Sequence, residues 1–232
     1  MKLSVVIPAY NEAQNVPIVL DDILEQFQFL VGELEIIVVD DGSTDNSYEC
    51  LMKYKKEKFP SLVILQNKVN RGLQFTLRSG YLAANGKFVS FIPSDGEVGA
   101  DQVKKLFDLS ESADIVVSKR LRNGIYPIHR QILTFGLQVI LRICLGFNYQ
   151  NMEGIYLFRK RIFDNLKLHP EGALINLEIP LRCKQMGCKF AHTTMECRPR
   201  LSGESKIAGS RHIALQIMRT CIEILKLRFR LG

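Results

Sequence analysis

The stretch "LEIIVVDDGS", residues 34–43, decides the fold. It begins as a continuous apolar run rich in isoleucine and valine, and it ends in two aspartates and a glycine. An uninterrupted run of this kind is typical of a strand that is buried on both faces of a parallel sheet. Polar residues and glycine directly after the run mark the carboxyl end of the strand, the edge at which parallel sheets bind their ligands.

Helical and strand patterns alternate on both sides of this stretch. The apolar spacing predicts strands over 3–10, 61–67, 87–92 and 113–120, and helices over 11–27, 44–59, 73–85 and 100–112. Asn11 or Asn15 is the expected cap of the first helix, and Thr44 or Asp45 that of the second. The alternation predicts an α/β fold with a Rossmann-like, mostly parallel sheet flanked by helices.

The second half of the chain is less regular. We expect an apolar helix over 129–147, a strand running into a basic turn over 153–163, a helix over 174–187, a strand over 189–199 and a basic amphipathic C-terminal helix. The predicted organisation is one domain over 1–210, divided into 1–120 and 121–210, followed by the helix 211–232. A length of 232 residues is sufficient for one such domain with a buried core.

Charge and hydropathy restrict the partners. The net charge of +7 favours anionic partners such as nucleotides, phospholipid surfaces or nucleic acid. Nucleic acid is the weakest of these, because aromatic residues interleaved with Arg and Lys in a recognised module are absent from the sequence. The apolar run at the N-terminus is too short for a signal peptide, and Arg142 interrupts the longest apolar window, so we expect a cytoplasmic or peripheral protein.

The cysteines fit an intracellular protein. There are 6 of them at irregular spacings, mostly within apolar segments, as expected for reduced core residues. Cys183, Cys188, His192 and Cys197 can be imagined as a zinc set. Their spacing lacks the close pair of most structural zinc sites, and they fall in different predicted elements, so a core role is the favoured interpretation.

Acidic residues follow two of the predicted strands. Asp40 and Asp41 lie where carboxylates can bind a nucleobase or ribose, and capping the next helix is the alternative role. We expect one aspartate in each role, with Asp41 at the nucleotide. Asp95 and Glu97, in "FIPSDGEV" (91–98), fit either a solvated turn or a site for Mg²⁺ or Mn²⁺ and a phosphorylated ligand. In the second case the metal would neutralise charge on a departing nucleoside diphosphate.

Four blocks of the sequence carry a resemblance to a known family. They are "SVVIPAYNE" (4–12), "IIVVDDGSTD" (36–45), "NRGLQFTLRSGYLAANGKFVSFIPSDGE" (70–97) and "RPRLSGESK" (198–206). In this order they resemble the inverting family 2 glycosyltransferases of GT-A fold. More narrowly, they are similar to the dolichol-phosphate mannosyltransferase and polyprenyl-phosphate glycosyltransferase branch, for which the last block is the most selective.

The resemblance implies roles for individual residues. The nucleotide would be held by Pro8, Tyr10, Glu12, Asp40, Asp41 and Asp95, and the metal by Asp95 and Glu97. The segment 118–136 resembles the acceptor segment, so that Arg120, Arg130 and Thr134 would contact a lipid phosphate. Arg200, Ser205 and Lys206 would close over the phosphates. The group expected to act in catalysis comprises Asp95, Glu97, Arg120 and Arg130.

The chain departs from the family pattern at a few positions. Pro93 stands where the first aspartate of the usual Asp-x-Asp motif belongs, and Glu97 stands where this branch often has glutamine. Gln150 occupies the place of an expected acid, with Glu153 nearby. A phosphate monoester has a second pKa near 6 and needs no strong base, so the missing acid favours a phosphate acceptor over a sugar hydroxyl.

The predicted function is therefore an inverting transfer of sugar from a UDP- or GDP-sugar to dolichyl or undecaprenyl phosphate at the cytoplasmic membrane face. The expected partners are the nucleotide sugar, the polyprenyl phosphate, a divalent metal and the membrane surface, without nucleic acid. The C-terminal helix fits a membrane surface or a packed helix equally, and a separate membrane protein would supply the anchor. Alternatives are a glycan or lipid-linked hydroxyl acceptor, or a catalytically weak subunit that binds nucleotide sugars.

Overall fold

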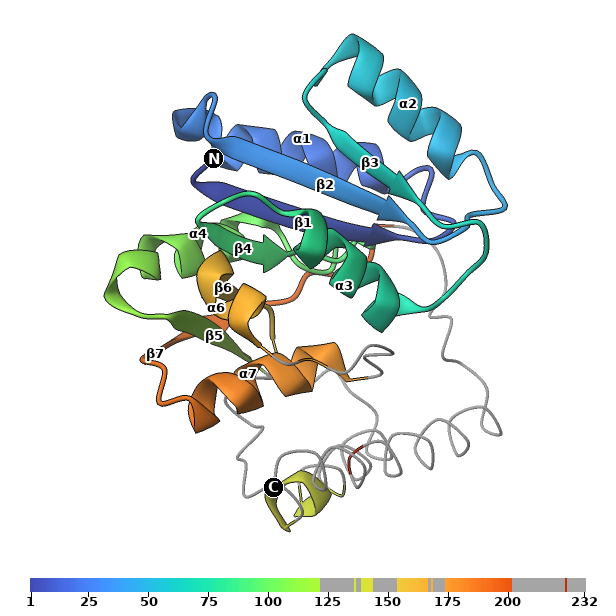
Figure 1. Cartoon of the computed structure of the whole chain (residues 1–232). Coiled ribbons are helices and arrows are strands. Elements are labelled where there is room, and N and C mark those ends of the chain that lie inside the picture. Colours follow the sequence, from blue (N-terminus) through green and yellow to red (C-terminus); the bar gives the residue numbers. More distant parts are fainter. Residues whose placement is uncertain are drawn as a thin grey trace.

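The computed structural model describes residues 1–121, 136, 139–143, 154–166, 168, 174–201 and 224. Within these residues the chain forms a seven-stranded sheet in the order β3-β2-β1-β4-β6-β5-β7 (Figure 1). The strands are β1 (Leu3–Ala9), β2 (Leu34–Asp40), β3 (Val63–Gln66), β4 (Phe88–Phe91), β5 (Ile115–Arg120), β6 (Tyr156–Arg159) and β7 (Phe190–Met195).

The sheet is mostly parallel, as the sequence predicts. β1 pairs in parallel with β2 on one side and with β4 on the other, and β2 pairs in parallel with β3. β6 is antiparallel to its neighbours β4 and β5, and β7 is parallel to β5. The carboxyl ends of β1, β2 and β4 therefore meet at one edge, with β1 between its two neighbours.

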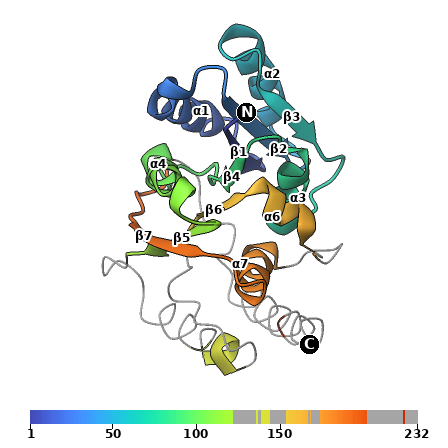
Figure 2. The same ribbon diagram turned by 60° about the vertical axis from the view of Figure 1, so that its left-hand side comes forward.

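Helices cover both faces of the sheet (Figures 1 and 2). α1 (Val16–Gln26), α2 (Ser47–Glu57) and α4 (Ala100–Asp108) lie together, since Tyr54 of α2 donates to Asp21 of α1, and the ring of Phe107 meets that of Phe27 at the end of α1. α3 (Leu73–Ala83), α6 (Lys160–Asn165) and α7 (Ile175–Gln185) lie on the other face. The short helices η1 (Gln28–Leu30) and η2 (Ser110–Ser112) follow α1 and α4.

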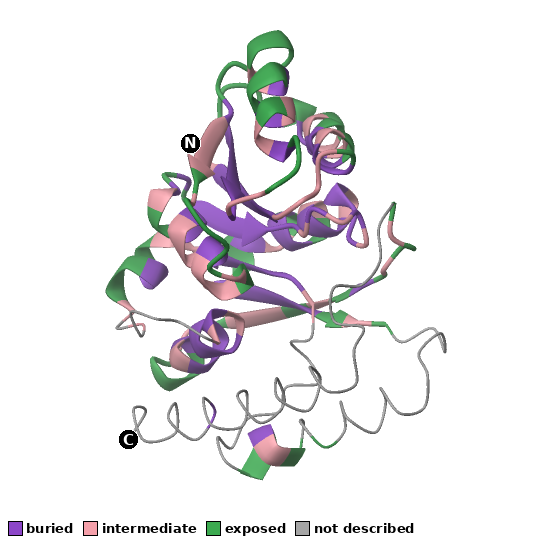
Figure 3. Ribbon diagram, turned by 90° about the vertical axis from the view of Figure 1, so that its right-hand side faces the viewer, coloured by how far each residue is buried: buried purple, intermediate pink, exposed green. Residues whose placement is uncertain are grey.

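The core lies between the sheet and these helices (Figure 3). All residues of β1, β2 and β4 are buried, which is why their sequences are mostly apolar instead of alternating between apolar and polar residues. Each fully buried Val, Leu, Ile or Phe side chain stabilises the fold by about 1.5–3 kcal/mol. The strands that carry the polar loops are thus anchored in the hydrophobic core.

A buried polar network closes the opposite edge of the sheet. Glu35 of β2 is 7% exposed and accepts hydrogen bonds from the Ser4 hydroxyl (2.5 Å) and from the backbone N–H and side-chain amide of Asn85 (2.8 and 2.9 Å). The Ser4 hydroxyl in turn accepts the N–H of Gly86 (2.8 Å). Partial burial opposes ionisation of Glu35, but these hydrogen bonds hold its pKa below the usual value.

Several local predictions are corrected by the structure. α1 begins at Val16, and Asn11 does not cap it, because Asn11 adopts φ 54° and its side-chain amide bonds Thr44 instead of a helix end. Asn15 occupies the capping position of α1 without a side-chain capping bond. The segment after β6, predicted as a basic turn, is helix α6. The capping position of α2 is occupied by Asn46 instead of the predicted Thr44 or Asp45, although Asp45 accepts the Ser47 N–H at the start of that helix (3.0 Å).

The described helices include none that is long and apolar enough to cross a membrane. Most of the predicted C-terminal helix and most of the predicted helix 129–147 lie outside the described residues.

Candidate functional site

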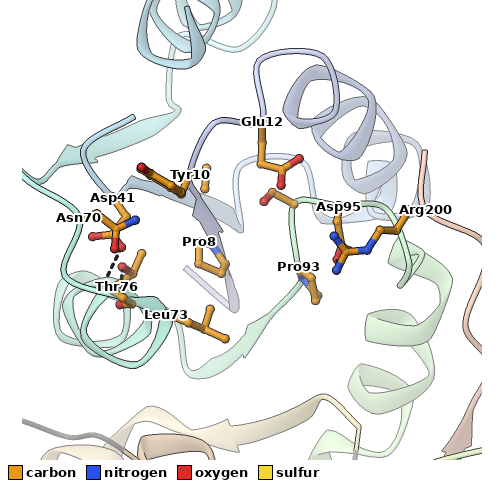
Figure 4. Close-up of a pocket in the computed structure, with 13 residues that line it drawn as sticks. Pro8, Tyr10, Glu12, Asp41, Asn70, Leu73, Thr76, Pro93, Asp95 and Arg200 are labelled. Carbon is orange, nitrogen blue, oxygen red and sulfur yellow. Dashed lines mark hydrogen bonds and ion pairs between the residues drawn. The ribbon is translucent and has the colours of Figure 1, made fainter. Parts of the chain in front are cut away.

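A cleft of about 320 Å³ opens at the shared edge of β1, β2 and β4 (Figure 4). This is the point at which the strand order reverses, since β1 is followed along the sheet by β2 on one side and β4 on the other. Open parallel sheets bind ligands at such a point. The lining residues are Pro8, Ala9, Tyr10, Glu12, Asp41, Asn70, Gly72, Leu73, Thr76, Pro93, Ser94, Asp95 and Arg200.

One end of the cleft is organised by Asp41, which is 3% exposed. Its Oδ1 accepts hydrogen bonds from the side-chain amide of Asn67 (2.7 Å) and the backbone N–H of Arg71 (2.9 Å), and its Oδ2 accepts the N–H of Gly72 (2.8 Å). These bonds tie the loop before α3 to the end of β2. Asp41 therefore positions Asn70 and the start of α3 around the cleft while its own side chain lines it.

Asp40 takes a different position from its neighbour. It is 0% exposed and absent from the cleft lining. Its carboxylate accepts the backbone N–H of Ser43 (3.2 Å) and the side-chain amide of Gln66 (3.2 Å). The predicted pair of aspartates is thus divided: Asp41 lies at the cleft, and Asp40 holds the turn beneath it.

Gly42, between these aspartates and the next helix, has φ +69°. A Cβ atom there would lie 2.6 Å from the backbone carbonyl carbon of Val69. The glycine is required both by the backbone conformation and by this close approach.

The loop after β1 is bonded to the loop after β2. The backbone N–H of Asn11 donates to the Ser43 hydroxyl (2.9 Å), and that of Glu12 donates to the Ser47 hydroxyl (2.8 Å). The positive φ of Asn11 turns the chain at this point. These contacts fix Tyr10 and Glu12, whose side chains line the cleft as drawn in Figure 4.

Asp95 and Glu97 lie on the loop after β4. Asp95 lines the cleft and its Oδ1 accepts the N–H of Glu97 (3.1 Å), across Gly96 with φ 73°. The segment that follows β7 runs alongside this loop, since Arg198 donates its N–H to the Glu97 carbonyl (2.8 Å) and Leu201 donates to the Asp95 carbonyl (3.2 Å). Two segments about a hundred residues apart in the chain thus form one wall of the site.

Both carboxylates are paired with arginines. Arg200 bonds Asp95 through Nη2 (3.0 Å to Oδ2) and Glu97 through Nε (2.7 Å to Oε1), while Arg120 bonds Glu97 through Nη2 (3.0 Å to Oε2). Partial burial opposes ionisation of Glu97, but the hydrogen bonds from Arg200 and Arg120 hold its pKa below the usual value. The bond to Glu97 raises the pKa of Arg200 in turn. The two arginines and the two carboxylates thus form one ion-pair network at the wall of the cleft.

The residues fit a divalent cation that is shared with a phosphate ligand. His, Cys, Asp and Glu side chains in the described part of the chain form no group of three that could hold a metal ion. Asp95 is the one of the two predicted metal ligands that lines the cleft. Mg²⁺ is commonly held by one or two carboxylates, with phosphate oxygens and water completing its coordination. Asp95, with Glu97 behind it, meets that requirement.

Several predicted site residues are not brought together by the described structure. Glu97 and Arg120 do not line the cleft. Glu97 bonds Arg200, which does line it, and Arg120 bonds Glu97 from behind. Arg130, Thr134, Ser205 and Lys206 lie outside the described residues, as do Gln150 and Glu153. Their predicted roles remain predictions.

Other lining residues received no role in the sequence analysis. These are Ala9, Asn70, Gly72, Leu73, Thr76 and Ser94. All except Ala9 fall in the block 70–97 that carries the resemblance, around the start of α3 or after the end of β4. Their place in this block could have identified them as site residues. The contacts of the loop before α3 with Asp41, however, depend on the fold and cannot be seen in the sequence.

Comparison with known proteins supports the family resemblance that the sequence motifs indicate. Residues 4–165 match the family described as "Glycosyl transferase family 2". The chain is 31% identical over 209 residues to a dolichyl-phosphate beta-glucosyltransferase of Saccharomyces cerevisiae, covering 76% of this chain and 61% of that protein. It is 29% identical over 217 residues to a dolichol-phosphate mannosyltransferase of Pyrococcus furiosus, covering 90% of this chain and 60% of that protein. The chain therefore spans about three fifths of the length of these relatives.

The fold is shared with solved glycosyltransferase structures. Glucosyl-3-phosphoglycerate synthase from Mycobacterium tuberculosis, crystallised with Mn²⁺, UDP and glucosyl-3-phosphoglycerate, superposes with a TM-score of 0.68 at 24% sequence identity. The match covers 98% of this chain and 79% of that one. At this identity the similarity establishes the fold.

Proposed function

Because the chain belongs to glycosyl transferase family 2 and is similar to dolichyl-phosphate glycosyltransferases, we propose that it transfers a sugar from a UDP- or GDP-sugar to a polyprenyl phosphate. The named activities of the yeast and archaeal relatives support dolichyl phosphate, or its bacterial counterpart undecaprenyl phosphate, as the acceptor class. We further propose that transfer takes place at the cytoplasmic face of a membrane, with residues 1–120 binding the donor and 121–210 the acceptor.

The observation that carries this proposal is the two-ended cleft. Polar groups without basic side chains lie at one end, around Asp41, Asn70 and Thr76, while Asp95 and Arg200 lie at the other (Figure 4). The first end suits the hydrogen-bonding edge of a nucleobase and a ribose. The second end suits a diphosphate, which a guanidinium group binds with two parallel hydrogen bonds. A nucleoside diphosphate thus matches both the order of the groups and the size of the cleft.

The chemistry follows from this placement. An oxygen of the acceptor phosphate attacks the anomeric carbon from the face opposite the diphosphate, so that the new C–O bond forms as the bond to the diphosphate breaks. The configuration of the sugar inverts, and the electron pair leaves with the nucleoside diphosphate. The acceptor monoester has a second pKa near 6, so it needs no strong base at neutral pH.

Charge at the leaving group is the main requirement of such a step. Arg200 lines the cleft and can donate to diphosphate oxygens, and Arg120 adds a second positive charge behind Glu97. A divalent cation held by Asp95 would supply further positive charge to the departing diphosphate. The Mn²⁺- and Mg²⁺-containing complexes of the mycobacterial synthase support a metal of this type.

A radiolabelled transfer assay tests the proposal. A panel of UDP- and GDP-sugars is incubated with the protein and with undecaprenyl or dolichyl phosphate in parallel reactions, with Mn²⁺, with Mg²⁺ and with chelator. The expected result is metal-dependent label in the organic phase from one donor. Asp95→Asn should abolish it, whereas Asp108→Asn, an equal charge change on the exposed side of α4, should not.

The outcomes separate the alternatives. Label in the aqueous phase with a glycan, and none in lipid phosphate, would move the acceptor to a sugar hydroxyl. Donor binding without transfer to either acceptor would identify a subunit that binds nucleotide sugars. Either result would reject the polyprenyl-phosphate proposal.

A further inference from the structure

The side chain of Arg200 occupies the position at which a cation would approach the site. Its guanidinium bridges the two carboxylates expected to take the metal, at 3.0 Å from Asp95 Oδ2 and 2.7 Å from Glu97 Oε1. The remaining oxygens are also engaged, Asp95 Oδ1 by the Glu97 N–H and Glu97 Oε2 by Arg120. The acidic pair is thus already neutralised by the protein itself.

This arrangement disfavours a metal ion that arrives alone. A divalent cation on Asp95 Oδ2 would lie within a few ångströms of the guanidinium, in a partly buried site where like charges repel strongly. Asp95 is 16% exposed and Arg200 31% exposed, so solvent screens the repulsion incompletely. To bind the metal, the protein must first release Arg200 from the carboxylates.

The cleft offers Arg200 a second partner. Arg200 lines the cleft beside Asp95, on the side where the proposed diphosphate would lie. Its backbone segment is held on both sides, by the bond of Arg198 N–H to the Glu97 carbonyl and that of Leu201 N–H to the Asp95 carbonyl. The side chain can therefore exchange carboxylate oxygens for phosphate oxygens by rotation, while the backbone stays in place.

We propose that Arg200 is a built-in counter-ion, which holds Asp95 and Glu97 until a diphosphate enters the cleft and then moves to the diphosphate, freeing Asp95 for a divalent cation. The consequence is that metal and diphosphate bind with strong mutual dependence, and that the metal alone binds weakly. This inference rests on the proposed donor site, but not on the identity of the sugar or of the acceptor.

Binding of Mn²⁺ measured by electron paramagnetic resonance tests the inference. The intact chain is titrated with Mn²⁺ alone, and then with Mn²⁺ in the presence of UDP, GDP or inorganic pyrophosphate. Arg200→Gln removes the charge and keeps much of the side-chain volume. Arg198→Gln is the matched control, because it makes the same charge change two positions away, on a side chain that pairs with Asp101 and Asp22 instead of the acidic pair.

The expected result is that Arg200→Gln binds Mn²⁺ alone at least about 10-fold more tightly than wild type, within the usual range of coupling between sites. The same variant should lose most of the enhancement that diphosphates give to Mn²⁺ binding, and Arg198→Gln should change neither quantity. Arg200→Lys keeps the charge but cannot bridge both carboxylates, so it should bind Mn²⁺ with intermediate affinity. If Arg200→Gln fails to fold, Arg200→Lys provides the test instead.

Unchanged or weaker binding of Mn²⁺ alone by Arg200→Gln would overturn the counter-ion role, as would an equal gain in Arg198→Gln. Neither result would affect the transfer assay. Conversely, absence of transfer to lipid phosphate would reject the proposed acceptor and leave the Mn²⁺ titration valid.

Discussion

Replacing Asp41 by asparagine separates two roles that this residue can have at the cleft: holding the loop before α3 and binding the nucleotide. The carboxylate accepts one side-chain and two backbone hydrogen bonds, from Asn67, Arg71 and Gly72, at 2.7–2.9 Å and almost without solvent exposure. Asparagine has nearly the same shape, but only one of its terminal atoms can accept hydrogen bonds. The best placement keeps the two bonds to Oδ1 and turns the amide NH₂ group toward the N–H of Gly72.

The magnitude follows from these contacts. A hydrogen bond to a charged group contributes about 1.5–3 kcal/mol, and the variant loses one such bond and weakens two others. We therefore expect Asp41→Asn to lower the free energy of unfolding by about 2–4 kcal/mol in the absence of any ligand. Amide hydrogen exchange should accelerate at Arg71 and Gly72, because their acceptor is lost or weakened.

Urea denaturation followed by far-UV circular dichroism measures the free energy of unfolding. Circular dichroism is the suitable probe because the chain contains no Trp whose fluorescence could report unfolding. Asp108→Asn is the control, since its exposed side chain pairs only with Lys104 in the described contacts and its loss should fall within experimental error. If Asp41→Asn unfolds like wild type yet no longer binds nucleotide, Asp41 acts on the ligand alone and does not hold the loop before α3.

The other predictions concern the stability of the fold. Glu35→Gln should cost about 2 kcal/mol at neutral pH. The folded state lowers the pKa of Glu35, so its contribution to stability is present above the ordinary glutamate pKa of 4.5 and is lost as the pH falls below that value. The free energies of unfolding of wild type and Glu35→Gln should therefore converge in acid. A difference that stays constant with pH would contradict the ionised state of Glu35 in the fold. Gly42→Ala should lower the melting temperature more than Gly32→Ala, since both have positive φ but only Gly42 would place Cβ against backbone atoms. Equal losses would show that the close approach to Val69 does not matter.

The fold was largely predictable because its signal is local. The buried strands β1, β2 and β4 are mostly apolar, and the polar residues that follow them meet at one edge as a direct consequence of parallel pairing. The start of α1 was not predictable in the same way. Asn11 forms its bonds with Ser43 and Thr44 in the loop after β2, so its conformation depends on contacts that helical periodicity does not contain.

The sequence identified several of the residues that line the cleft, but not their contacts. Tyr10, Glu12, Asp41 and Asp95 line the cleft, and the motifs identified them. The pairing of Arg200 with Glu97 joins residues 103 positions apart, and a pattern along the chain cannot reveal it. The sequence did predict different roles for Asp40 and Asp41, and of the two only Asp41 lines the cleft. The bonds of Asp40 to Ser43 and Gln66 depend on the fold.

The most direct test of the donor site is a crystal structure of the chain with Mn²⁺ and whichever nucleoside diphosphate supports transfer. We expect the base and ribose beside Asp41, Asn70 and Thr76, the diphosphate beside Asp95, and Arg200 turned from the carboxylates to the phosphate oxygens. A nucleotide bound away from the edge of β1, β2 and β4, or bound there in the reverse orientation, would contradict the account.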